Sequence, residues 1–374
     1  MVTRSLTRLR YLPLCVMLCL AWYALAECAT KRGAALVAWE NAVLHGESWP
    51  ADELSGTSRA VWPGIEQLLP WQAMQESVAW NDGLLARPRT LFFTVPASIA
   101  IHWLGITPLL AIRLTAQCAV LISLWLLFVT AASIGGIKHG YLALGVALTM
   151  PTVWHYGSYG VSVGGTLLAT VLLYYAFWQW ERRPTLGTTV TAIVVTVCAT
   201  LQYAPLRVLM LPVLVITLGR IWRRWTYILL FLVVCSGVAW WQGSSGRWAL
   251  YHARGEQMVT GSNFVEPTVW GNIQKRASEL ISLVTVAWTT PVSAARDLDP
   301  GVPLSPPVLT GMVGGVALAM SRRAFLDYHA ITLLAGMAAL MGALLLTSRV
   351  DLQRMAVLTV PIALFVAHGL AQRP

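Results

Sequence analysis

The sequence predicts an all-α, polytopic membrane protein, a single integral-membrane domain of residues 1–374 with about ten transmembrane helices. Hydrophobic residues make up 57% of the chain and charged residues only 11%, whereas soluble globular proteins carry about 25% charged residues. Ten apolar segments approach the ~20 residues that a helix needs to cross a bilayer. They are 11–28, 107–133, 139–155, 161–180, 186–203, 205–219, 225–241, 305–320, 328–347 and 352–371.

Basic residues are concentrated in every second connection between these segments. Those connections hold twelve of the 26 Lys and Arg residues but only two acids, Glu181 and Asp327, so they account for the formal charge of +10. Because positive residues stay on the cytoplasmic side, both termini are predicted to be cytoplasmic. Such short clusters beside helices are typical of contact with anionic lipids, not of nucleic-acid binding. The twelve are Arg4, Arg8, Arg10, Lys138, Arg182, Arg183, Arg220, Arg223, Arg224, Arg322, Arg323 and Arg373.

The first apolar segment, 11–28, also has the pattern of a signal peptide, because it follows three arginines and precedes small residues. Nine further apolar segments follow it, which favours an uncleaved first helix.

The six cysteines form no CxxC or Cys/His spacing, so no zinc site or disulfide framework is predicted. We interpret these cysteines as small packing residues within the helices.

Two long connections lie on the predicted outer side. The first, 29–106, contains an amphipathic run and regularly spaced tryptophans, which predict amphipathic helices lying on the membrane or, alternatively, a groove for a lipid or peptide. Its last part, 91–104, is short and interrupted by Pro96, which predicts an interfacial or re-entrant helix. The second, 242–304, predicts one helix over 269–287 and a proline-rich return.

No signature of a soluble enzyme is present: the chain has no P-loop, GxGxxG, HExxH or GxSxG pattern. The GxxxG pairs Gly160–Gly164 and Gly311–Gly315 predict close approach between helices. Aromatic residues near the segment ends predict belts at the membrane interfaces. These residues are Tyr174, Tyr175, Trp178, Trp180, Trp240 and Trp241.

Five scattered motifs carry a family resemblance. They are Gly105–Arg113 (GITPLLAIR), Pro151–Gly160 (PTVWHYGSYG), Tyr203–Arg207 (YAPLR), Pro300–Leu304 (PGVPL) followed by Gly311–Gly315, and Arg354 with Pro361 and Gly369. In order and spacing they resemble the C-type (GT-C) integral-membrane glycosyltransferases. The likeness is greatest to the bacterial branch near dolichyl-phosphate-mannose-protein mannosyltransferases. The resemblance covers about 31 to 371 and implies a multi-pass protein of the bacterial inner (cytoplasmic) membrane.

The chain departs from this family at the expected acidic pair. Family members place two acids before the helix that here reads Gly33–Gly46, but this chain has Lys31 and Arg32 there. A cation at neutral pH neither accepts a proton nor binds a divalent metal. The segment from Pro151 to Gly165 also contains no acid. The remaining candidates for a catalytic base are Glu27, Asp52 and Glu53, and no metal site or further cofactor is predicted.

Three functions remain open for the chain, and the resemblance implies the first two. The first is transfer of a sugar from a polyprenyl-phosphate donor to an acceptor on the outer face. The second is a catalytically inactive scaffold or accessory subunit of a membrane complex that binds lipid. The third, less favoured because ionisable residues are rare inside the spans, is a transporter. Membrane lipids and other complex subunits are the implied partners. The implied lipid-phosphate ligands are Arg207, Arg113, Arg354 and Tyr203, and His155 and Tyr159 are placed in the donor or acceptor groove.

Overall fold

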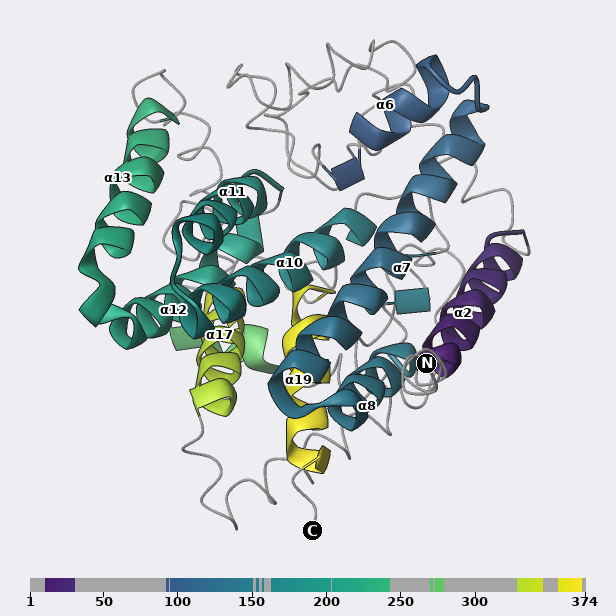
Figure 1. Cartoon of the computed structure of the whole chain (residues 1–374). Helices are drawn as coiled ribbons and strands as arrows, with labels where there is room; N and C mark the ends of the chain where they lie inside the picture. Colours follow the sequence, from purple (N-terminus) through teal and green to yellow (C-terminus); the bar gives the residue numbers. More distant parts are fainter. Residues whose placement is uncertain are drawn as a thin grey trace, which may run out of the picture.

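The structure is a computed structural model of the chain and is built from helices (Figure 1). It describes residues 11–30, 92–93, 95–150, 153–154, 157, 163–202, 204–242, 270–271, 273–278, 328–345 and 356–371. Within these ranges no β-strand occurs, which confirms the all-α prediction.

Seven helices fall where apolar segments predict them, with ends displaced by only a few residues: α2, α7, α10, α11, α12, α13 and α17. The α-helices are α2 (Leu12–Thr30), α6 (Val95–His102), α7 (Pro108–Gly135), α8 (Ile137–Leu148), α10 (Val163–Arg182), α11 (Leu186–Gln202), α12 (Ala204–Arg220), α13 (Trp225–Gln242), α17 (Tyr328–Leu345) and α19 (Thr359–Ala371). Two 3-10 turns, η4 (Trp222–Arg224) and η8 (Ala356–Leu358), precede α13 and α19. The predicted segment 305–320 lies outside the described ranges, and of the predicted helix 269–287 only residues 270–271 and 273–278 are described, all of them helical.

Two predictions about helix boundaries are wrong, and proline explains both. The segment 139–155 does not form one long helix, because α8 ends at Leu148 and its last turn tightens until the Met150 N–H donates to Ala147 O (3.0 Å). Pro151 disfavours helical backbone in the residue before it. Pro96 does not interrupt a helix but lies in the first turn of α6, where its missing N–H costs little. With 8 residues, α6 is too short to cross a bilayer.

Helices α7 and α10 pack directly against each other at the centre of the bundle. A Cβ added at Gly164 of α10 would lie 2.9 Å from the Ala116 backbone oxygen of α7, so only glycine permits this approach. The close contact predicted for the first GxxxG pair is therefore confirmed at Gly164, whereas Gly160 and Gly311–Gly315 lie outside the described residues. Helices α2, α6 and α8 pack on α7, and α11 and α12 pack on α10 (Figure 1).

The side chains of this core differ from the sequence prediction in two respects. Trp180 is fully buried and not part of an interfacial belt: it stacks on Phe231 (ring centroids 4.9 Å apart) and donates a hydrogen bond to Thr189 Oγ1 (2.9 Å). Tyr174 is also buried. Cys15, Cys19 and Cys118, in contrast, are exposed on the outside of the bundle and are not core packing residues, whereas Cys198 and Cys235 are half-buried.

Several connections predicted to lie on one side of the membrane meet at one end of the bundle. Tyr11 contacts Phe128 (6.3 Å), and Phe128 contacts Tyr141 (4.9 Å), so α2 begins where α7 ends and α8 begins. His139 contacts His368 near the end of α19 (5.5 Å). Arg220 Nη1 lies 2.8 Å from Glu181 Oε1, which joins the ends of α10 and α12. We call this the basic end, and the end where α7 and α12 begin the opposite end.

By length and composition, two of the described helices could cross a membrane: Pro108–Gly135 and Trp222–Trp240. Four shorter apolar helices accompany them: Leu12–Ala26, Ile137–Leu148, Leu186–Ala199 and Thr359–Ala371. Two qualifying helices are consistent with a membrane protein but do not by themselves establish ten spans.

Candidate functional sites at the two ends of the bundle

At the opposite end, two of the predicted lipid-phosphate ligands lie near helix N-termini. Arg207 is in the first turn of α12, with Pro205 beside it in the same turn. Arg113 lies in the second turn of α7, which begins at Pro108 after the extended residue Thr107. Both arginines are partly buried and both already contact other groups of the protein.

Helix α10 packs against both α7, which carries Arg113, and α12, which carries Arg207 (Figure 1). The first turn of a helix presents backbone N–H groups without intrahelical partners, and the helix dipole adds partial positive charge there. Each arginine therefore belongs to an arrangement suited to an anion.

Most other predicted site residues lie outside the described part of the chain. These residues are Tyr203, Arg354, His155, Tyr159, Asp52 and Glu53. Glu27 is located in the last turn of α2, which runs from the basic end toward the opposite end. Among the described residues, no group of three His, Cys, Asp or Glu side chains could hold a metal ion.

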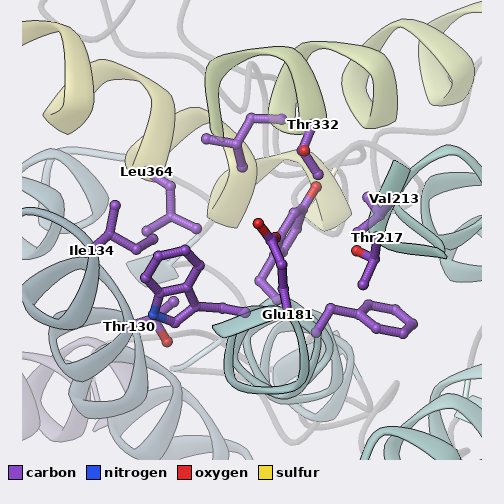
Figure 2. Close-up of a pocket in the computed structure, with 11 residues that line it drawn as sticks. Thr130, Ile134, Glu181, Val213, Thr217, Thr332 and Leu364 are labelled. Carbon is purple, nitrogen blue, oxygen red and sulfur yellow. The ribbon is translucent and has the colours of Figure 1, made fainter. Parts of the chain in front are cut away.

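A pocket that the sequence did not predict lies at the basic end, and its walls are mainly apolar with a few polar side chains among them. Helix α10 contributes Tyr174, Phe177, Trp178 and Glu181, which lie three or four residues apart and so share one helix face. Opposite them are Thr130 and Ile134 of α7, Val213 and Thr217 of α12, Thr332 and Leu333 of α17, and Leu364 of α19. The cavity has a volume of about 40 Å³, enough for two or three water-sized groups. Figure 2 shows the Glu181 side chain extending from α10 into the pocket, toward the side that carries Thr332. Thr217 lies to one side of it.

Two features of this pocket are unusual for a helix interior. The Glu181 side chain is only 10% exposed and forms an ion pair with Arg220, whose side chain is 50% exposed. The Tyr174 hydroxyl is buried and has no hydrogen-bond partner among the residues that the structure describes. It lies against α17, where a Cβ on Gly336 would be 3.1 Å from the Tyr174 oxygen. A buried hydroxyl without a partner costs about 1–3 kcal/mol, so a ligand or water in the pocket would relieve a real penalty.

A sequence signal for this pocket existed in the charge distribution. Glu181 is one of only two acids among the twelve basic residues of the predicted cytoplasmic connections. An acid retained there indicates a specific partner, which the structure identifies as Arg220. Tyr174 gave no such signal, because a tyrosine near a segment end is also typical of an interfacial belt.

No model of a known protein family matches this chain, and no curated protein matches its sequence.

Proposed function

We propose that this chain is a multi-pass protein of the bacterial inner membrane that binds a polyprenyl phosphate at its opposite end and transfers the attached sugar.

The observation that best supports a location in the membrane is the exposed apolar surface of α13. Only 6% of its apolar stretch Trp222–Trp240 is buried, and large apolar side chains cover its outside. Those that are exposed include Leu229, Leu232, Val233 and Val234. A contiguous apolar surface of this kind favours lipid over water as its neighbour.

The ends of α13 support the same placement. Trp222 and Trp225 are 64% and 65% exposed at the basic end, and Trp240 is 75% exposed at the other. The axial distance between these tryptophans is about 25 Å at 1.5 Å per residue, comparable with the hydrocarbon thickness of about 30 Å. The Arg223 guanidinium lies 5.5 Å from the Trp222 ring centroid, a pairing of aromatic and basic residues typical of a cytoplasmic interface. The basic end is accordingly the cytoplasmic end in this proposal.

The lipid phosphate in this proposal is held by Arg207. An inverting sugar transfer needs cations around the leaving phosphate and a base beside the acceptor hydroxyl. Arg207 provides a planar two-pronged donor matched to phosphate, and the first turn of α12 adds backbone N–H groups. The resemblance to GT-C glycosyltransferases supports the sugar as the transferred group, with Glu27 at the end of α2 as the base nearest to the expected acidic position.

An inactive lipid-binding scaffold is the second candidate, and one observation specifically favours it. Lys31 and Arg32 occupy the positions of the acidic pair in the family that the chain resembles. Cations there keep affinity for a lipid phosphate but cannot act as a base. Both functions share the phosphate site at Arg207 and differ only in turnover.

Native mass spectrometry of the purified protein with an added polyprenyl-phosphate sugar tests this proposal. Arg207→Ala should lower lipid occupancy about tenfold or more, and Arg207→Lys should also lower it, because a lysine cannot form the two-pronged contact. Arg224→Ala at the basic end is the matched control and should leave occupancy unchanged. Equal occupancy in all three variants would remove Arg207 from the site. Sugar transfer by the wild-type protein then separates the enzyme from the scaffold.

A further inference from the structure

The pocket at the basic end contains a set of groups that matches a zwitterion. Glu181 and Arg220 form an ion pair at the boundary of the bundle, with the acid inside the pocket and the arginine half exposed beside it. The negative Glu181 side chain is thus directed into the pocket, and the positive Arg220 side chain lies at the surface beside it. A ligand with a cationic tip and an anionic group behind it would match both charges in that order.

The polar groups inside the pocket are suited to accept hydrogen bonds from such a cationic tip. The Tyr174 hydroxyl is more than nine-tenths buried, lines the pocket and forms no hydrogen bond within the described part of the chain. The Glu181 carboxylate is an acceptor, and the Thr217 and Thr332 hydroxyls provide further oxygen atoms. A primary ammonium carries three N–H donors and no acceptor. The carboxylate among these oxygen atoms only accepts hydrogen bonds and is negatively charged, so it favours an ammonium over an anion or an apolar group.

We propose that this pocket binds the headgroup of an aminophospholipid, with its primary ammonium between Glu181 and Tyr174 and its phosphate against Arg220. The cavity of about 40 Å³ accepts an ammonium and one methylene, by the space of about 10–15 Å³ that one water-sized group needs. A trimethylammonium is larger and has no N–H to donate, so phosphatidylcholine is excluded by both size and chemistry. An anionic headgroup without an ammonium would place negative charge beside the Glu181 carboxylate, which already pairs with Arg220.

This inference rests on the membrane part of the proposed function, because a lipid headgroup reaches the pocket only if the basic end lies at a bilayer surface. It is independent of the phosphate site at Arg207, which lies on the same helix as Arg220 but at its other end. The two sites can therefore fail separately. Loss of the aminophospholipid with retention of polyprenyl phosphate would affect only this inference, and the reverse would affect only the proposed function.

Tyr174→Phe is the decisive variant, because it removes only the hydroxyl. Without ligand, loss of a buried hydroxyl that has no partner should leave the protein as stable or slightly more stable. With ligand, the ammonium loses one acceptor, so retention of phosphatidylethanolamine relative to phosphatidylcholine should fall about fivefold or more. Tyr227→Phe removes the same atom from α13 outside the pocket and serves as the matched control. Glu181→Gln should cause a larger loss, about tenfold or more.

The measurement is native mass spectrometry of the full chain after exchange into mixed micelles containing equal amounts of phosphatidylethanolamine, phosphatidylcholine and phosphatidylglycerol. We expect wild type and Tyr227→Phe to retain phosphatidylethanolamine selectively, and Tyr174→Phe and Glu181→Gln to lose that selectivity. Equal retention of the three lipids by wild type, or unchanged selectivity in Tyr174→Phe, would overturn the proposal. Selective retention of soluble phosphoethanolamine in place of the lipid, sensitive to Tyr174→Phe, would assign the pocket to a free solute and also overturn it.

Discussion

The contact between α7 and α10 makes a sharp prediction about stability. In Gly164→Ala, the new Cβ would lie 2.9 Å from the Ala116 backbone oxygen and 3.4 Å from the Ala116 Cα. Both atoms are backbone, so the strain is relieved only if the two central helices move apart. Overpacking of this kind typically costs about 1–3 kcal/mol, which outweighs the gain of up to about 1 kcal/mol from alanine in a helix.

Gly145→Ala in α8 is the matched control for this experiment. No atom lies within 4 Å of a Cβ at Gly145, so only the helix propensity changes and the variant should be up to about 1 kcal/mol more stable. Thermal unfolding in one detergent, followed by circular dichroism, measures both variants against wild type. The two identical substitutions should shift stability in opposite directions. A Gly164→Ala protein as stable as Gly145→Ala would refute the packing of α10 on α7.

Three further predictions concern the core, the outer surface and the departure from the family pattern. Trp180→Phe should cost about 2–3 kcal/mol through the lost hydrogen bond to Thr189 and the cavity left behind, whereas Trp225→Phe, at an exposed position, should leave the unfolding temperature unchanged. Val233→Lys, at the centre of α13 where the side chain is 61% exposed, should lower membrane integration by about 2.5–3.5 kcal/mol. Improved solubility without loss of membrane association would instead indicate that α13 faces water. Lys31→Asp combined with Arg32→Glu should create divalent-metal binding detectable by calorimetry, and no change in metal affinity would show that these positions do not correspond to the family's acidic pair.

Helix positions were well predicted from the sequence because they depend on one quantity, the length of an apolar run. Helices α7, α11 and α13 begin and end within two residues of the predicted segments. The failure at α8 comes from Pro151, whose effect on the preceding residue is local and outweighs the apolar composition. Pro96 was interpreted as a break although a proline is equally suited to a first helical turn.

The orientation of side chains within each helix was not predictable in the same way. When a helix is apolar on all sides, hydrophobicity does not distinguish the face toward other helices from the face toward lipid. Trp180 therefore resembled an interfacial residue although it is fully buried, and Cys118 resembled a packing residue although it is exposed. The basic-end pocket depends on which faces of α7, α10, α12 and α17 meet. That information resides in long-range contacts, which no single-sequence pattern encodes.

The candidate site at the opposite end was predicted only in part. Arg207 lies in the first turn of α12, as the sequence Tyr203–Arg207 indicated. The grouping of Arg113 with Arg207 was an expectation from the family resemblance and stays a prediction, since the helices that carry them, α7 and α12, both pack on α10. Sequence spacing gives the depth of each residue along its own helix but not the order in which the helices pack.

Cysteine accessibility in intact bacterial cells tests the central claim, a multi-pass protein with its basic end in the cytoplasm. The six native cysteines are first replaced, and single cysteines are introduced as Arg223→Cys in η4 and Trp103→Cys between α6 and α7. Trp103 is 69% exposed and lies in the predicted outer loop 29–106. A membrane-impermeant maleimide should label position 103 in intact cells and position 223 only after permeabilisation. Labelling of position 223 in intact cells would contradict the proposed orientation.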